Sequence, residues 1–458
     1  MSWKPSELIR DKKQPHHLPA LLRVASYDIF FNGIISPLHN QYQSESMPLL
    51  SVQEAQQRIL SRFTPVEAIY LPLTQAVGHI LATEITASLP LPAFDNSAMD
   101  GFALLAADTA SARPDVPCQL AVVADIPAGN QASTPIHTGE AARITTGAPL
   151  PRGADAIVPV EDTDIKERTP GRPIPGHVKI YKPVKPGTNV RPQGSDVQVG
   201  QQVLCTGRRL RSQEIGLLAM LGNAHVSVYR HPRLALLSCG DELVPVEAEL
   251  TPGKVRDANT YTLSALIEES SGEVISLGIA ADDPRAIQSS LDQAVEKHTD
   301  LIISSAGVSV GAFDFVKDVV MKHGSLDFWK VNMRPGKPLA FGEYHGIPFV
   351  GLPGNPVSAY IGFEVFIRPA IEKLSGLPPR ARRRQRVHLA EAIETDGRET
   401  YLRAVVSEED GIYTARLTGH QGSGNLLSLV QANALLIIPS GVKSLATGAE
   451  VAAWLFER

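Results

Sequence analysis

The sequence predicts a multi-domain protein of the α/β plus β class, with a parallel-sheet α/β domain at its centre. Its 458 residues are enough for about three domains. Between residues 232 and 374, short β-branched apolar runs alternate with helical patterns, which favours a parallel sheet with helices on both faces. Short strands between glycine and proline turns precede and follow this region, which indicates further domains rich in β-structure.

The central region gives the clearest pattern of elements. In a sheet of this kind, ligands bind at the carboxyl ends of the strands. The loops that follow the predicted strands are therefore the expected place for a site. From the spacing of apolar residues we expect strands at 233–238, 274–279, 300–304 and 348–352, and helices near 260–271, 284–297, 314–322 and 357–374.

The rest of the chain divides by composition. Residues 1–46 are polar and weakly patterned, and we expect a disordered extension or sequence translated ahead of a start at Met47. Ser51 caps a helix whose apolar face begins at Val52. The basic run at 380–386 is interpreted as a solvated linker. The expected domains are an elongated linker domain at 47–90 and 187–222, a β-rich insert domain at 91–186, the α/β domain at 223–375 and a small C-terminal β-barrel domain at 376–458.

Composition excludes several classes of protein. A net charge of −5 gives no reason to expect a nucleic-acid partner, and no apolar run approaches the length of a membrane span. Cys118, Cys205 and Cys239 are widely spaced and form no CxxC motif, so neither a disulfide framework nor a structural zinc site is supported. Sparse cysteine fits the reducing cytosol, and we expect a cytoplasmic protein.

Two loops at the ends of predicted strands carry the features of a phosphate site. The first follows strand 300–304 and contains Gly307, Ser309 and Gly311, whose amides and hydroxyl can hold a phosphate. The second follows strand 348–352 and reads Pro353-Gly354-Asn355-Pro356. Asn is a favoured N-cap and Pro a favoured first helical residue, so we expect the amides of Val357 and Ser358 to be free for an anion.

Cations lie between these two loops in the segment FWKVNMRPGKPLAF. Lys330 alone is equally well explained as part of a solvated edge strand. Arg334 and Lys337 belong to an RPGKP turn in which two prolines fix the backbone. Rigid placement of two cations suits a tetrahedral oxyanion.

Acidic residues recur in the loops and suggest a metal ion. Oxygen ligands without histidine favour magnesium over zinc or copper. Asp314 lies closest to the glycine-rich loop and is ranked first as a ligand, while Asp282 is one of several other loop acids. Most loop acids are individually turn formers or helix caps. Further acids stand at Asp95, Asp196 and Glu214, and Thr146 lies in the turn RITTGAP.

One alternative on the same residues is a hydrolase. Gly307, Ser309 and Gly311 match the G-x-S-x-G nucleophile elbow, and histidines follow downstream. No histidine stands in a recognisable context, however, and the neighbouring loops are cationic. The phosphate-binding interpretation is therefore preferred.

Taken together, the motifs resemble the molybdopterin molybdenumtransferases, a family that includes the E domain of gephyrin. The resemblance covers essentially all of 47–458 in order. It is carried by FDNSAMDG (94–101), RITTGAPLPRGADAIVPVED (143–162), RPQGSDVQVG (191–200), GDEL (240–243), AGVSVGAFDF (306–315), RPGKP (334–338), LPGNPVSA (352–359) and QGSGNLLSLVQANALLIIP (421–439).

The resemblance implies an activity and a set of partners. It implies a homodimer of elongated four-domain subunits with a molybdopterin-binding α/β domain. The implied reaction transfers molybdate to adenylylated molybdopterin with magnesium and releases AMP. A molybdopterin adenylyltransferase would supply the substrate, and maturation proteins of molybdoenzymes would receive the product.

The resemblance also assigns roles to residues. Asp95, Thr146, Asp196 and Glu214 would reach the pocket from the partner subunit. Asp282 and Asp314 would hold magnesium. The functional positions would further include Lys330, Arg334, Pro353 and Pro356, and the contacts to molybdate would fall on Arg334, Lys337 and Ser358, with Arg403 and Ser423 from the C-terminal domain.

Two rival functions remain at this point. The first is the adenylyltransferase of the preceding step, which needs only the central domain, so the insert and the C-terminal domain count against it. The second is a non-catalytic scaffold, as in the receptor-anchoring relatives. The acids and cations in the loops count against the scaffold.

Overall fold

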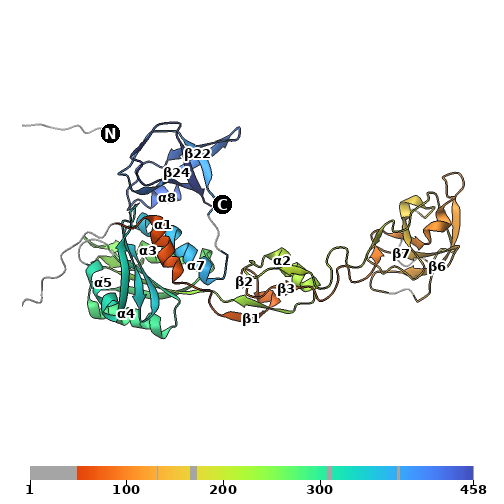
Figure 1. Cartoon of the computed structure of the whole chain (residues 1–458), viewed down its shortest axis with the longest axis horizontal. Helices are drawn as coiled ribbons and strands as arrows, with labels where there is room; N and C mark the ends of the chain where they lie inside the picture. Colours follow the sequence, from red (N-terminus) through yellow and green to blue (C-terminus); the bar gives the residue numbers. More distant parts are fainter. Residues whose placement is uncertain (1–48, 131–132, 166–172, 307–311, 379–381, 457–458) are drawn as a thin grey trace, which may run out of the picture. The chain divides into compact units, whose positions relative to one another are not determined.

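The computed structural model describes residues 49–130, 133–165, 173–306, 312–378 and 382–456 (Figure 1). The expectations for 1–46 and for Gly307, Ser309 and Gly311 lie outside these residues, as do the side chains of 312–314. The predicted fold class is confirmed, with a central α/β domain, β-rich domains and a closed barrel near the C-terminus. Among the described residues, no helix is both long and apolar enough to cross a membrane.

The central domain is built on a six-stranded sheet. Four strands are parallel, as predicted, and the sheet continues into β20, which is antiparallel to β21, and into the edge strand β18, which is antiparallel to β20. Neither is among the four predicted strands, although an edge strand was one of the two explanations of Lys330. In the order of pairing, the strands are β16 (Glu273–Ala280), β13 (Arg233–Cys239), β17 (Leu301–Ala306), β21 (Ile347–Pro353), β20 (Pro338–Tyr344) and β18 (Gly324–Lys330).

Helices cover both faces of this sheet because its strands are apolar on both sides (Figure 1). In β13, Leu234 and Leu236 face one core and Ala235 and Leu237 the other. The first core contains α1 (Val52–Ser61), α3 (Ala258–Glu269), α6 (Pro356–Gly362), the π-helical turn η4 (Phe363–Ile367) and α7 (Arg368–Leu374), and the second contains α4 (Pro284–Glu296) and α5 (Ala312–His323).

The N-terminal helix starts where the sequence predicts. The Ser51 side chain accepts a hydrogen bond from the amide of Glu54, and the Glu54 carboxylate accepts one from the Ser51 amide. Val52, Ala55 and Ile59 are buried on one face, which packs into the core shared with α7.

The linker region consists of small sheets and one helix. Its three-stranded sheet brings together segments from both ends of the region, so the chain leaves and returns through the same module. Its elements are β1 (Ala68–Pro72), η1 (Leu73–Gln75), β2 (Ile80–Leu81), β3 (Ile85–Thr86), β11 (Gln202–Leu204), α2 (Ser212–Met220) and β12 (His225–Tyr229), and the short pair β4 (Asn96–Ser97) and β10 (Val190–Arg191) leads to the insert.

The insert is a five-stranded sheet of mainly antiparallel strands. Apolar side chains from its two faces form separate small cores. The strands, in order of pairing, are β8 (Ala156–Pro159), β5 (Gly101–Leu104), β7 (Glu140–Ile144), β6 (Cys118–Ile126) and β9 (His177–Ile180), with short 3₁₀ helices η2 (Ala106–Thr109) and η3 (Val160–Asp162).

The C-terminal domain is a barrel that closes because β24 pairs with both β25 and β26. Tyr401, Leu429, Ile437 and Trp454 of this domain pack into the same core as the central helices, so the barrel is seated on the central domain. Its elements are β22 (Gln385–Leu389), β24 (Glu399–Glu409), β25 (Ile412–Leu417), α8 (Leu427–Val430), β26 (Ala434–Ile438) and β28 (Glu450–Leu455), with the pair β23 (Ile393–Glu394) and β27 (Ser444–Leu445) beside it.

The basic run before the barrel differs from the expectation of a solvated linker. Arg382 forms an ion pair with the buried carboxylate of Glu364, and its guanidinium lies 4.9 Å from the centre of the Trp454 ring. Residues 379–381 lie outside the described part of the chain. Part of the run therefore fastens the barrel to the central domain.

Candidate functional site

A cleft of about 860 Å³ lies between the central domain and the barrel. It contains the residues at the carboxyl ends of β13, β17 and β21, where a ligand is expected in such a sheet. The structure thus brings together most of the sites predicted for the oxyanion and the phosphates. The predicted residues that line the cleft are Arg334, Lys337, Pro353, Gly354, Asn355, Pro356, Ser358, Arg403 and Ser423.

Arg403 contributes a buried cation to the cleft. Its side chain is fully buried, at 0% exposure. Its Nε donates to Ser428 Oγ at 3.0 Å and its Nη2 to the Gly422 carbonyl at 3.0 Å. Both acceptors are neutral, and among the described residues no carboxylate pairs with this guanidinium. Burial lowers the pKa of Arg403 to about 10, so the group is still a cation at neutral pH.

A buried charge of this kind is costly. Desolvation of an ion is compensated in proteins by an opposite charge, and neutral hydrogen-bond partners supply only part of that compensation. The cleft wall therefore holds a positive charge whose natural partner is an anionic ligand.

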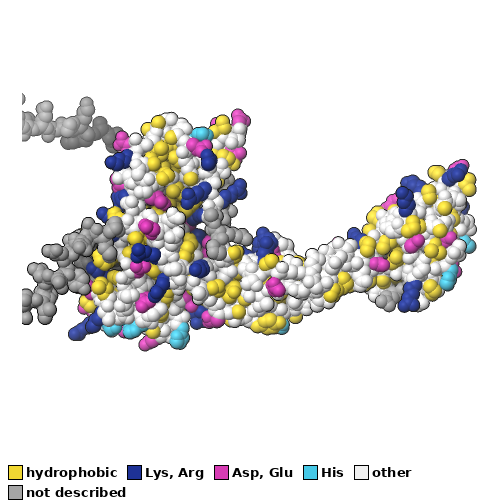
Figure 2. Space-filling view, in the orientation of Figure 1, with side chains coloured by type: hydrophobic (Ala, Val, Ile, Leu, Met, Phe, Trp, Pro, Cys, Tyr) yellow, Lys and Arg dark blue, Asp and Glu magenta, His cyan; other side chains and the backbone are white. Residues whose placement is uncertain are grey.

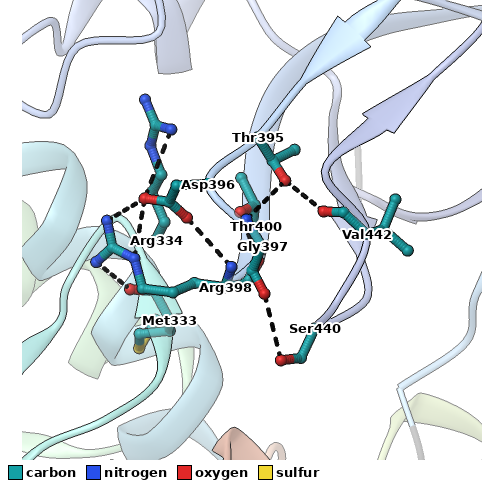
Figure 3. A network of polar contacts seen from close by, with 9 residues as sticks. All are labelled: Met333, Arg334, Thr395, Asp396, Gly397, Arg398, Thr400, Ser440 and Val442. Atoms are coloured by element: carbon teal, nitrogen blue, oxygen red, sulfur yellow. Dashed lines mark hydrogen bonds and ion pairs between the residues drawn. The ribbon is translucent and has the colours of Figure 1, made fainter.

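Arg334 and the barrel are connected by a network of polar contacts (Figure 3). β19 (Met333–Arg334) pairs with the start of β24, and Arg398 Nη1 donates to the Met333 carbonyl at 3.0 Å. Asp396 accepts two hydrogen bonds from the Arg398 side chain, while its Oδ2 lies 3.7 Å from Arg334 Nη1. The hydrogen bonds that Asp396 accepts from Arg398 are the main reason that the pKa of Asp396 lies below its usual range.

This arrangement leaves Arg334 available to a ligand. Its distance to Asp396 exceeds that of a hydrogen bond, and its side chain is 48% exposed. Asp396 itself is rigidly placed, because Gly397 has a left-handed φ of +85° and its turn is tied to the Ser440–Val442 segment. Arg334 and Arg398 therefore stand together at the cleft.

The other predicted cations differ from each other. Lys337 is exposed in the cleft and forms no ion pair with a described residue. Lys330, at the end of β18, is exposed and is not among the residues that line the cleft. The catalytic role predicted for Lys330 is thus without support from its position and stays a prediction.

The expected anion site at the start of α6 is only partly present. The Val357 amide donates to the Ser423 carbonyl of the barrel at 3.0 Å, so the expectation that it is free is wrong. Asn355 occupies the N-cap position, but its side chain makes no capping hydrogen bond. Ser358 is buried and lines the cleft. The helix terminus therefore serves first as a contact between the domains.

The loop before α6 is held from behind by Asn259. Its Nδ2 donates to Ser305 Oγ at 2.7 Å and to the Gly354 carbonyl at 2.8 Å. One side chain thereby joins the ends of β17 and β21. The Pro353–Pro356 segment is thus held at a fixed place in the cleft wall.

The carboxylate of Asp282 has an unpaired oxygen. Its Oδ1 is buried and has no hydrogen-bond partner, and its amide donates to Asp241 Oδ1 at 3.1 Å. Burial, followed by the nearby charges of Asp241 and Glu242, raises the pKa of Asp282. Among the described residues, no three His, Cys, Asp or Glu side chains are grouped as a metal centre. The side chain of Asp314 lies outside the described part.

Four further predicted residues lie away from this cleft. Asp95, Thr146 and Asp196 are exposed. The Asp95 carboxylate accepts from the Gln193 amide at 2.6 Å, and Thr146 donates through its amide and hydroxyl to Asp100. None of them is among the cleft-lining residues.

Glu214 is buried at the start of α2 and pairs with Arg208 and Arg211. The hydrogen bond from Arg211, followed by that from Arg208, lowers the pKa of Glu214 to about 2. Its carboxylate thus has a structural explanation, and the predicted catalytic role is untested.

Sequence reasoning missed several residues of the cleft, of which three make the hydrogen bonds described here or below. Arg398 follows a DG turn, Asn259 follows the N-cap Asp257, and Gln421 begins the QGSGN segment. Only the last lies in a motif that the resemblance covers. For Arg398 and Asn259 the sequence offers a turn and a helix start, which are common and carry no sign of a ligand.

Models of three protein regions match the chain. They are the MoeA N-terminal region (domain I and II) at residues 50–222, a probable molybdopterin binding domain at 235–373 and the MoeA C-terminal region (domain IV) at 386–456.

Relatives and solved structures match over most of the chain. A molybdopterin molybdenumtransferase from Nostoc sp. is 38% identical over 83% of this chain and 86% of its own length. A molybdopterin molybdenumtransferase 2 from Mycobacterium tuberculosis is 39% identical over 88% of this chain and 99% of its own length. The crystal structure of a MoeA molybdopterin biosynthesis protein from Pyrococcus horikoshii superposes with a TM-score of 0.76 at 31% identity, covering 90% of this chain and all of that one. The chain therefore belongs to the MoeA family of molybdopterin molybdenumtransferases.

Proposed function

We propose that the protein is a molybdopterin molybdenumtransferase that inserts molybdenum from molybdate into adenylylated molybdopterin and releases AMP, with magnesium as the metal ion. The observation that carries the proposal is Arg403, a fully buried guanidinium in the cleft wall that is paired with neutral groups alone among the described residues. Molybdate is a dianion and would supply the missing charge.

Four further residues of the cleft fit the same ligand. Arg334 and Lys337 come from the central domain, and Ser423 comes from the barrel. The buried hydroxyl of Ser358 adds a hydrogen-bond donor. A tetrahedral oxyanion between the two domains would be held by cations and hydroxyls from both, which would give the barrel a part in binding.

The described residues partly fit a magnesium ion. Magnesium is commonly bound by one or two carboxylates together with substrate phosphates, and it does not require a cage of protein ligands. The unpaired, buried Oδ1 of Asp282 would be one such ligand, and Asp314 is proposed as the second. Bound magnesium would neutralise charge on the two phosphates of the adenylylated pterin.

The chemistry needs no side-chain nucleophile. Water cleaves the phosphoanhydride, leaving one phosphate on the pterin and one on AMP. The two dithiolene sulfurs bind molybdenum while one oxygen of molybdate leaves as water with the two thiol protons.

The residues of the cleft would position the two substrates for this reaction. Arg334, Lys337 and Arg403 would hold the oxyanion beside the sulfurs. The Gly354–Pro356 wall and the loop at 307–311 would hold the phosphates. Positioning and electrostatics then supply the catalysis.

The active form is proposed to be a homodimer in the cytoplasm. Asp95, Thr146, Asp196 and Glu214 line no part of the cleft, so a role in it would require the partner subunit. Apolar side chains lie on the surface of the linker region (Figure 2). The large ones that are exposed include Tyr70 at 70%, Val77 at 60% and Met220 at 64%, and such side chains favour an interface. An adenylyltransferase would deliver the substrate, and molybdoenzyme maturation proteins would take the product.

The direct test is release of AMP by the purified protein from adenylylated molybdopterin and magnesium, with and without molybdate. Release that depends on molybdate, and a product that reconstitutes an apo-molybdoenzyme, would support the transferase. A folded protein that binds the pterin and releases no AMP under either condition would be a scaffold. Synthesis of adenylylated pterin from ATP would identify the adenylyltransferase of the preceding step.

A further inference from the structure

The side chain of Gln421 extends the pairing of β24 beside Arg403. The β24–β25 ladder ends at the pair Ala404–Leu417, although the Thr418 amide still donates to the Arg403 carbonyl at 3.1 Å. The Arg403 amide donates instead to Gln421 Oε1 at 2.9 Å, and Gln421 Nε2 donates to the Arg403 carbonyl at 3.1 Å. The side-chain amide of Gln421 therefore supplies the acceptor that the neighbouring strand does not, together with a further donor to the carbonyl.

The same side chain also shapes the loop itself. Gln421 Nε2 donates a second hydrogen bond, to the Gly419 carbonyl at 3.2 Å. The two residues that follow Gln421 then make the contacts that matter in the cleft. The Gly422 carbonyl accepts from the Arg403 guanidinium, and the Ser423 carbonyl accepts from the Val357 amide of the central domain.

We propose that Gln421 is a positioning residue for oxyanion binding, which fixes the Arg403 guanidinium and the Ser423 segment through its bidentate contact with the backbone of β24. The inference rests on the proposed function, because the oxyanion is taken to be molybdate. It assigns a role in binding to a residue that needs to contact no substrate.

Glutamine has the required combination of groups. The site needs one acceptor for the Arg403 amide and two donors for the carbonyls of Arg403 and Gly419. Glutamate of the same shape keeps the acceptor but has no donor at neutral pH. Methionine of similar size has neither. The two substitutions therefore separate loss of the donors from loss of all three hydrogen bonds.

The experiment compares Gln421→Met, Gln421→Glu and the control Gln431→Glu in the full-length protein. Gln431 is exposed in the same domain, so Gln431→Glu adds the same charge without disturbing the hydrogen bonds of Gln421. Molybdate binding is measured by calorimetry, and KM for molybdate and kcat are measured separately. Backbone amide exchange of 418–428 is measured without ligand.

We expect both Gln421 variants to weaken molybdate binding about tenfold or more, because at least two hydrogen bonds are lost. KM for molybdate should rise to match, while kcat at saturating molybdate stays within about twofold of wild type. Amides of 418–428 should exchange faster in these variants than in Gln431→Glu.

The outcomes separate the inference from the function on which it rests. A wild-type protein that binds no molybdate would reject the proposed function and the inference with it. A wild-type protein that binds molybdate, with Gln421 variants of equal affinity, would reject only the inference, whatever the exchange rates. A fall in kcat with unchanged KM would also overturn it.

Discussion

Two buried charges near the junction of the central domain and the barrel have opposite surroundings. The Glu364 carboxylate is buried between Arg368 and Arg382, which pair with it directly. The Arg403 guanidinium is buried just as completely, but its partners are a hydroxyl and a carbonyl. The first charge is compensated by the protein and fastens the barrel. The second has no counter-ion among the described residues.

The contrast also appears in the titration of the two groups. Burial alone would raise the pKa of Glu364, but its hydrogen bonds and charge interactions with Arg368 and Arg382 bring it below the ordinary value. For Arg403, burial acts without an opposing charge and lowers the pKa. A buried charge that lacks its counter-ion is thus a marker of a binding site, whereas a compensated one is a marker of structure.

The largest effect on stability is expected at the compensated charge. Glu364→Leu leaves two arginines without their shared carboxylate, and breaking a buried pair typically costs about 3–5 kcal/mol. Denaturant unfolding should show this loss. Glu296→Leu on α4, where the side chain is exposed, is the matched control and should change little. Equal stability of the two variants would show that the paired charge of Glu364 does not stabilise the fold.

The second prediction concerns activity at the uncompensated charge. Arg403→Met should lower kcat/KM for molybdate by about 10²–10³-fold, as expected for removal of a preorganised charge in a site. Its free energy of unfolding should stay within about 1 kcal/mol of wild type or rise, since a desolvated ion is removed. Arg416→Met, an exposed arginine of β25, is the control. A variant that unfolds and keeps its activity per folded molecule would contradict the account.

The third prediction applies the comparison to Glu214, which is also compensated. Its pKa of about 2 lies below the ordinary value of 4.5, so the pairing contributes stability above pH 4.5 that is lost as the pH falls toward 2. Glu214→Gln should cost about 2 kcal/mol at pH 7, and the difference from wild type should shrink on acidification. Thermal unfolding between pH 3 and 7 measures this. Turnover of the folded variant separately tests the catalytic role predicted from the resemblance.

The smallest effect is expected at the exposed cations. Arg334→Gln and Lys337→Gln should each raise KM for molybdate about tenfold, and added salt should reduce the contribution of these side chains. The contribution of Arg403 should be less sensitive to salt because it is buried. Titrations at low and high ionic strength make the test. An equal effect of salt on the contributions of Arg334, Lys337 and Arg403 would show that burial does not protect the Arg403 charge from screening.

Much of the fold could be predicted because it depends on local pattern. The predicted strand 233–238 corresponds to β13, and the helix predicted near 284–297 corresponds to α4. The strands β18 and β20 were not among the four predicted strands, since GSLDFWK has no clean alternation and its hairpin partner follows a loop. An edge strand entered only as one of two explanations of Lys330, which ends β18. The fold class followed from the alternation in the central region and from the short strands around it.

The site was predictable where it depends on turns and not where it depends on packing. The RPGKP and PGNP loops could be recognised in the sequence by their proline and glycine residues, and both line the cleft. Nothing local shows that Arg403 is buried without a counter-ion, or that the Val357 amide is taken by a carbonyl of the barrel. These properties arise only when the two domains meet. The spacing and composition of the sequence could therefore not predict them.

The role of Arg403 can be decided by calorimetric titration of molybdate into the wild-type protein and into Arg403→Met, with unfolding measured on the same samples. We expect saturable binding to wild type and at least a 100-fold loss of affinity in the variant, without loss of stability. Equal affinity in the two proteins would show that the uncompensated charge of Arg403 has no part in binding the oxyanion.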